Sequence, residues 1–326
     1  MSNNKFKEFE EMITRSHRNV TGIVVLKDGN TSYKQYFNDC NENSNLHIYS
    51  VSKSIISLLI GIAIEEGYIG SVEQSIFDFF PNYKIKNKQQ AIQNTTIENL
   101  LTMTTAYKYK DSPLSYIKYF MSKDWVKYSL DLLVEEEPSS FRYTPIIGPD
   151  ILSGILVNST GMSVLDFANK YLFNYLEINV ENNIILHSAK EQSRFNKSTT
   201  ISGWIMDSKG TNSAGWGLTL SAVDMAKIGQ LYLNNGVYND HQIVSCDWIN
   251  RSTEVNSNWN EMNLSYGYLW WIINPHEQSF AAMGDGGNTI YVNRDKNLVV
   301  AITGLYNKGV GDKISLITEA IEPLFE

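Results

Sequence analysis

Residues 47–64 read His-Ile-Tyr-Ser-Val-Ser-Lys-Ser-Ile-Ile-Ser-Leu-Leu-Ile-Gly-Ile-Ala-Ile, and this stretch decides how the chain is interpreted. Its second half is apolar on nearly every side, which predicts a helix over 50–67 that is buried inside a domain. Ser50 and Lys53 stand three residues apart at the start of that helix, so their side chains share one face. The stretch therefore predicts a serine and a lysine in contact at the mouth of a buried helix.

Such a pair suits nucleophilic catalysis by serine. Burial disfavours the charged form of a lysine and makes it a better base toward a neighbouring hydroxyl. A helix N-terminus adds free N–H groups where an oxyanion would develop. The alternative is a serine that caps the helix beside a solvated lysine. The same Ser-x-x-Lys spacing also occurs at Ser2–Lys5 and Ser115–Lys118, but only the Ser50 copy opens a long apolar run.

Further segments follow the serine–lysine pair in a fixed order. They are Tyr49–Ser54 around the pair itself, Ile97–Thr105, Phe141–Tyr143, Ala214–Leu218 with Asp224–Lys227, Tyr266–Trp271, Gly284–Asn288 and Leu298–Val300. On these segments the chain, from about residue 20 onward, resembles the serine β-lactamase-like, or penicillin-recognising, superfamily. It is most similar to the branch of class C β-lactamases, related esterases, D-amino-acid amidases and 6-aminohexanoate-dimer hydrolase.

Strand patterns stand at both ends of the chain. An early hairpin is expected over 21–37, around an Asp-Gly-Asn turn. Late strands are expected at 266–273, 279–283, 289–293 and 298–305. Because a lone hairpin is marginally stable, the early strands must join the late ones in one sheet, with the helical middle as an insertion.

The resulting fold expectation is α+β, a β-lactamase-like antiparallel sheet flanked by terminal helices. Residues 1–48 and 206–326 would form a discontinuous α/β domain, and residues 49–205 a mainly helical domain. The active site is expected in the cleft between the two.

The resemblance also implies a third catalytic group, Tyr143, which would pass the proton of the serine to the leaving group. The nearby ammonium of Lys53 would favour its phenolate. The chain departs from the family at Pro145, where class C-like members carry an asparagine, so the orientation of the lysine is lost or supplied elsewhere. Three aromatic residues lie in segments that border the cleft in relatives and are possible pocket walls: Tyr107, Tyr109 and Trp216.

The segment Gly-Asp-Gly-Gly-Asn, residues 284–288, occupies the place of the Lys-Thr-Gly or His-x-Gly strand of the family. There, the N–H just past the glycine forms an oxyanion hole with the N–H of the nucleophile. Carried over, the backbone donors are those of Ser50 and Asn288. Asp285 would replace the basic residue of relatives, and Gly286 and Gly287 would let the sheet edge approach a substrate. The alternative is a turn between strands.

Composition limits the partners. Of the 326 residues, 43% are hydrophobic and 19% are charged, as in globular proteins. A net charge of −8 argues against nucleic acid or an anionic membrane as partner. The N-terminus lacks the apolar core of a secretory signal, and Cys40 and Cys246 suggest no disulfide framework, so a cytoplasmic location is expected. No Cys/His spacing suggests a metal, no cofactor is expected, and the oligomeric state is left open.

The expected function is a serine hydrolase that cleaves a small ester or amide through an acyl-enzyme on Ser50. A true β-lactamase or D-Ala peptidase is the alternative within enzymes. A catalytically inactive binding protein of the same fold is the alternative from another class. His47 and His276 could serve as bases in a serine–histidine design, but without partner spacing they are interpreted as satisfied surface histidines.

Overall fold

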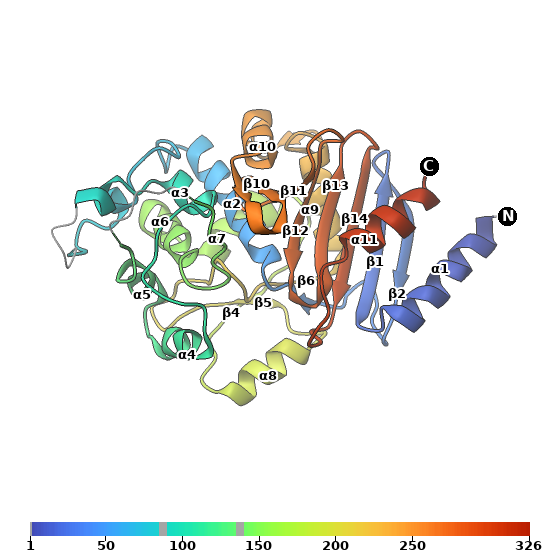
Figure 1. Cartoon of the computed structure of the whole chain (residues 1–326), viewed down its shortest axis with the longest axis horizontal. Helices are drawn as coiled ribbons and strands as arrows, with labels where there is room; N and C mark the ends of the chain where they lie inside the picture. Colours follow the sequence, from blue (N-terminus) through green and yellow to red (C-terminus); the bar gives the residue numbers. More distant parts are fainter. Residues whose placement is uncertain (1, 85–89, 135–139) are drawn as a thin grey trace.

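One eight-stranded sheet forms the centre of the protein (Figure 1), and its strand order is β2-β1-β14-β13-β12-β11-β10-β9. The computed structural model describes residues 2–84, 90–134 and 140–326. The strands are β1 (Val20–Lys27), β2 (Asn30–Tyr36), β9 (Ser257–Trp259), β10 (Leu264–Tyr266), β11 (Trp271–Asn274), β12 (Ser279–Gly284), β13 (Asn288–Asn293) and β14 (Leu298–Gly304). Because β1 pairs with β14, the early hairpin joins the late strands as expected.

The first hairpin turns at Asp28 and Gly29, whose φ angles of 52° and 77° both lie in the left-handed region. Two such residues make the turn whose twist matches that of the strands. Along β1 the side chains alternate between two cores. Val24 packs with α9 (Ala222–Leu233), whereas Ile23 and Val25 pack on the opposite face with the terminal helices.

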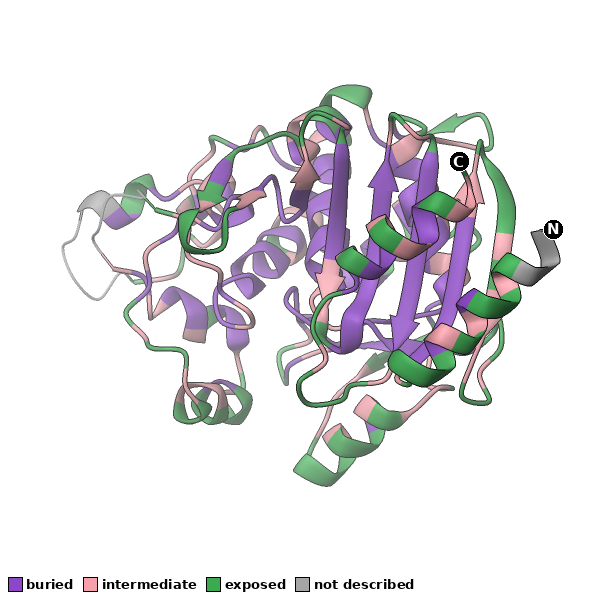
Figure 2. Cartoon of the chain, turned by 45° about the vertical axis from the view of Figure 1, so that its right-hand side comes forward, coloured by how far each residue is buried: buried purple, intermediate pink, exposed green. Residues whose placement is uncertain are grey.

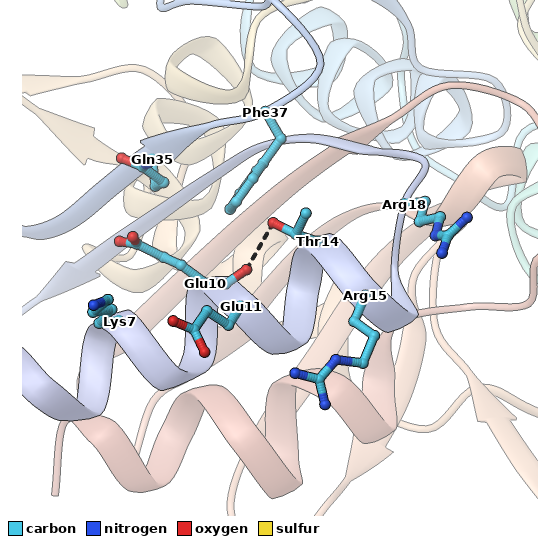
Figure 3. Close-up of a pocket in the computed structure, with 8 residues that line it drawn as sticks. All are labelled: Lys7, Glu10, Glu11, Thr14, Arg15, Arg18, Gln35 and Phe37. Carbon is cyan, nitrogen blue, oxygen red and sulfur yellow. Dashed lines mark hydrogen bonds between the residues drawn. The ribbon is translucent and has the colours of Figure 1, made fainter.

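Terminal helices cover that second face, as Figure 2 shows beside the buried strands. They are α1 (Ser2–Ser16), α11 (Ile314–Leu316), η6 (Ile317–Ile321) and η7 (Glu322–Leu324). A hollow between α1 and β2 is lined by side chains of both charge signs, among them Glu10, Glu11, Arg15 and Arg18 (Figure 3). It lies on the face of the sheet opposite to the helix that follows Ser50, and so apart from the predicted site.

The helix α2 (Val51–Glu65) runs through the middle of the molecule, and all its residues from Val51 to Ala63 are buried. It packs between the sheet and α6 (Asp150–Thr160). The other helices are η1 (Ile76–Phe79), η2 (Gln90–Asn94), α3 (Ile97–Leu101), α4 (Pro113–Met121), α5 (Trp125–Leu130), α7 (Val164–Ala168), η3 (Asn169–Phe173), α8 (Ala189–Lys197), α10 (Cys246–Thr253), η4 (Asn260–Met262) and η5 (Asp285–Gly287). Short strand pairs join β3 (Leu46–His47) to β6 (Thr219–Leu220), β4 (Asn182–Ile184) to β5 (Gly203–Ile205), and β7 (Val237–Tyr238) to β8 (His241–Gln242).

The single strand expected over 266–273 is wrong. The chain forms two strands there, β10 and β11, which pair with each other across a tight turn. Leu269 has a φ of 60°, and a side chain at Gly267 would lie 2.3 Å from the carbonyl oxygen of Ser252. The left-handed residue and the close backbone contact reverse the chain where the β-branched and aromatic pattern predicts continuity.

In the described ranges, no single helix has both the length and the apolarity to cross a bilayer. In the same ranges, one pair of helices has the required length and apolarity when the two are taken together: Asp150–Thr160 and Val164–Phe173, which are bent by 73° to each other.

Candidate active site

Ser50 and Lys53 meet at the N-terminus of α2. Ser50 is the N-cap residue, but its side chain makes no capping hydrogen bond, so its hydroxyl is available for chemistry. The Lys53 side chain is buried, with the residue 1% exposed, and its Nζ lies 3.0 Å from Ser50 Oγ. The structure therefore contradicts both parts of the alternative, the capping serine and the solvated lysine.

Two backbone carbonyls fix the orientation of the lysine. Lys53 Nζ donates to the oxygen of Pro145 at 2.7 Å and to that of Gly215 at 3.1 Å. As an ammonium, Lys53 uses its third hydrogen toward Ser50 Oγ; as an amine, it directs its lone pair there. The same arrangement thus serves both protonation states that a general base must adopt. Proline lacks a side-chain amide, and in this structure its carbonyl oxygen orients the lysine.

Asp150 holds the segment that carries one of these carbonyls. It is fully buried, and its Oδ1 accepts from the Ala214 N–H at 2.8 Å and from Ser213 Oγ at 3.1 Å. Its Oδ2 accepts from the Tyr119 hydroxyl at 2.6 Å. Burial raises the pKa of Asp150 to about 6, although these hydrogen bonds act in the opposite direction and lower it. Asp150 is absent from the site predicted from the sequence, although its place as a lone acid in an apolar segment was a usable signal.

Tyr143 lies beside the pair. Lys53 Nζ is 5.2 Å from the centroid of its ring, and the ring packs 5.3 Å from that of Trp271 and parallel to that of Trp259. Within the described part of the chain, the Tyr143 hydroxyl forms no hydrogen bond. The structure brings this tyrosine next to the lysine but does not join its hydroxyl to Ser50 or Lys53. Catalytic contacts often tighten only when a substrate binds.

The backbone that approaches the nucleophile belongs to Gly284, at the end of β12. A side chain on Gly284 would place Cβ 2.3 Å from the Ile48 carbonyl oxygen and 3.1 Å from the Ser50 nitrogen. Glycine is therefore required there by close approach. Among the described residues, the Ser50 N–H donates to no other group, so it is free to bind an oxyanion.

Asn288 occupies a different place from the one expected of an oxyanion donor. It is completely buried and pairs with Gly284 in the ladder between β12 and β13. Its side-chain Nδ2 donates to the backbone carbonyl oxygen of Asp285 at 2.7 Å, and its Oδ1 accepts from the Gly304 N–H at 3.0 Å, which braces the hairpin. The glycine that approaches Ser50 is thus Gly284, three residues before the one chosen from the sequence. The residue just past it is Asp285.

The remaining glycines of the motif shape the turn. Gly286 and Gly287 have φ angles of 77° and 76°, which side chains rarely adopt. With Gly284 as the motif glycine, the basic residue of relatives falls at Ala282, which is buried in the sheet. Asp285 is exposed and directly follows Gly284. Burial, and after it the charge of Asp285, raise the pKa of Tyr49, the residue before the nucleophile.

Two of the three expected pocket walls are core residues. Tyr107 is 7% exposed and packs on Gly148, and Trp216 is 6% exposed. Tyr109 is half-buried, and its hydroxyl donates to the Ile147 oxygen at 3.2 Å while the Arg142 guanidinium covers its ring. Trp259 and Trp271 lie near Lys53 instead, because both pack on the ring of Tyr143, which is next to that lysine. The aromatic surplus around residues 259–271 was the sequence signal for them.

His47 is buried, which corrects its interpretation as a surface residue. Its Nδ1 lies 3.0 Å from Asn196 Oδ1, and its Nε2 accepts from the Gly217 N–H at 2.9 Å. Burial lowers the pKa of His47 to about 3. A neutral ring with both nitrogens occupied cannot serve as the base for Ser50. His276 is exposed.

The chain is similar to known proteins in sequence and structure. A family model described as Beta-lactamase matches residues 6–318. An uncharacterized protein of Alkalihalophilus pseudofirmus is 24% identical over 271 residues, which are 79% of this chain and 73% of that protein. A candidate 6-aminohexanoate-dimer hydrolase from Bacillus anthracis has a TM-score of 0.76 at 19% identity, covering 97% of this chain and 81% of that chain. A family VIII carboxylesterase has a TM-score of 0.71 at 12% identity, covering 99% and 97%.

Proposed function

This chain belongs to the beta-lactamase family, and from that premise we propose that it is a serine hydrolase that cleaves a small ester or amide through an acyl-enzyme on Ser50. One observation carries the proposal. The Ser50 hydroxyl is free of any capping role and lies 3.0 Å from a buried lysine whose other two contacts are fixed carbonyls. A serine in this position is set up for activation by a neighbouring base.

In the first step, the Lys53 amine takes the proton of Ser50 while Oγ attacks the carbonyl carbon of the substrate. The oxyanion that develops accepts from the free N–H of Ser50 and, in this proposal, from the N–H of Asp285 just past Gly284. The proton passes to the leaving group through Lys53 and Tyr143, and the bond to the leaving group breaks. Water then attacks the acyl-enzyme, and the same groups return the proton to Ser50.

The surroundings of Ser50 favour neutral esters and amides over β-lactams. Penicillins and cephalosporins carry a carboxylate beside the scissile ring, which relatives meet with a lysine or histidine. Here that position falls at Ala282, and the nearby exposed charge is the carboxylate of Asp285. A negative group next to the bound carboxylate repels it. The carboxylesterase and the candidate dimer hydrolase that share the fold are consistent with this preference.

The test is intact-mass measurement after exposure to a fluorophosphonate, with turnover measured on a panel of activated esters, amides and β-lactams. We expect one label on Ser50, turnover of esters, and no label in Ser50→Ala, whose thermal midpoint should match the wild type. A label on Ser2 or Ser115 would refute the assignment of the nucleophile. Labelling of Ser50 without turnover of any substrate would favour the inactive binding protein.

A further inference from the structure

The helix α4 exposes a stripe of large apolar side chains. Leu114, Ile117 and Met121 are 60%, 53% and 79% exposed and lie on one face, at spacings of three and four residues. Phe120, at 36%, borders the stripe, while Tyr119 on the opposite face is completely buried. Of the eight large apolar side chains exposed in the described ranges, four lie on this nine-residue helix. Such a cluster marks an interaction surface.

Unpaired positive charge surrounds the stripe. Four exposed lysines lie in or beside α4, and none of them forms an ion pair with another described residue: Lys108, Lys110, Lys118 and Lys123. Two acids lie in the same segment, and both have partners. Asp111 lies 3.9 Å from the Arg142 guanidinium and accepts from the Tyr116 hydroxyl of α4 at 2.9 Å, and Asp124 caps α5. A chain of net charge −8 thus places beside this apolar stripe four lysines that form no ion pair within the described ranges.

The helix α8 extends this charged surface. Tyr119 of α4 and Phe195 of α8 belong to one core cluster, and both Figures 1 and 2 place the two helices along the same edge of the molecule. Three exposed basic side chains lie on α8, with one acid, Glu191, among them: Lys190, Arg194 and Lys197. We call the apolar stripe and these basic residues of α4 and α8 the basic edge.

We propose that the basic edge docks the protein on an anionic lipid surface. Leu114, Ile117 and Met121 would enter the boundary between headgroups and acyl chains, and the lysines would face the phosphates. An amphipathic helix with an apolar face and a lysine-rich border binds such surfaces. Because the stripe is the convex outer face of a helix, a fluid surface accommodates it without a matching groove.

A second copy of the chain fits the basic edge less well. In a two-fold contact the same patch meets itself, so the excess of basic residues on one copy would face the same excess on the other. The net charge of −8 argued against an anionic membrane, but that value sums the whole chain and hides a local excess of the opposite sign. This inference does not depend on the proposed chemistry at Ser50.

The test is co-sedimentation of the full chain with vesicles of phosphatidylcholine alone and of equal phosphatidylcholine and phosphatidylglycerol, at low and high salt. We expect binding only to the anionic vesicles, weakened by salt. Ile117→Ser with Met121→Ser should lower binding by roughly tenfold or more, since each buried apolar side chain is lost. Lys118→Glu with Lys123→Glu should lower it by at least roughly twentyfold, since each basic residue contributes about fivefold.

The matched control is Val255→Ser with Met262→Ser, which removes two apolar side chains that are 43% and 58% exposed elsewhere on the molecule. It should bind as the wild type does, and every variant should keep the wild-type thermal midpoint. Ser50→Ala should also bind fully, so a failure of docking and a failure of the hydrolase proposal are distinguishable. Equal binding by the stripe variants and the wild type would overturn the inference. A dimer in light scattering that the stripe variants abolish would also overturn it. An absence of binding to anionic vesicles would do the same.

Discussion

Replacing Gly284 by alanine should disable the enzyme without unfolding it. The new Cβ would lie 2.3 Å from the Ile48 carbonyl oxygen, whereas ordinary contacts begin at 3.4 Å. Strand β12 and the segment before Ser50 must therefore separate by roughly 1 Å, and a displacement of that size can cost about 10²-fold in rate. The overpacking itself should lower the free energy of unfolding by about 1–3 kcal/mol.

The assay is ester turnover together with the rate of fluorophosphonate labelling and the thermal midpoint. Gly229→Ala is the matched control, because its Cβ would meet Val299 at 2.5 Å in the core between α9 and the sheet, away from Ser50. Gly311→Ala, where nothing lies within 4 Å, controls for the substitution itself. We expect Gly229→Ala to lose stability and keep its rate, and Gly284→Ala to lose both. Near-normal turnover by Gly284→Ala would refute the placement of β12 against the nucleophile.

Three further predictions concern the groups around Ser50. Lys53→Ala and Tyr143→Phe should each slow the chemical step by roughly 10²–10⁴-fold, and the double variant should be little worse, since groups in one relay are not additive; near-normal turnover by Tyr143→Phe would remove that residue from the mechanism. Burial raises the pKa of Asp150 to about 6 from 3.8, so between these values the folded state binds a proton that the unfolded state lacks. Unfolding titrations should therefore show the wild type losing about 3 kcal/mol of stability relative to Asp150→Asn as the pH rises through that window, with no such change above it; parallel curves would contradict the burial of a titrating carboxyl. Hydrolysis of nitrocefin should be poor, and Asp285→Asn should raise acylation by anionic β-lactams roughly threefold to tenfold relative to a neutral ester; an unchanged ratio would show that Asp285 does not face the substrate.

Local sequence determined the parts of the fold that depend on near neighbours. The apolar run after Lys53 specifies a buried helix because one periodic pattern covers all its faces, and the structure has α2 over Val51–Glu65. The contact between Ser50 and Lys53 followed from a spacing of three residues at its start. The early hairpin followed from turn chemistry at Asp28 and Gly29. The family resemblance, carried by motifs in order, is confirmed by the match over residues 6–318.

Tertiary structure decided the features that depend on contacts between distant segments. Pro145 and Gly215 are 92 and 162 residues from the lysine that they orient, and no local pattern encodes that a backbone carbonyl will point there. The glycine-rich motif offered three glycines of equal chemistry, and only the packing of β12 on α2 distinguishes Gly284 from Gly286 and Gly287. Register between a strand and a helix is set by the summed packing of the whole domain.

The same reason explains His47 and the basic edge. Burial of His47 depends on α8, whose Asn196 and Phe195 lie about 150 residues away in sequence. The basic residues around α4 could be read along the chain. Only the folded structure shows that α4 and α8 share a core cluster and that Leu114 and Met121 are exposed. Spacing and composition report what a segment prefers by itself, whereas exposure and close approach are properties of pairs of segments, which only the folded chain brings together.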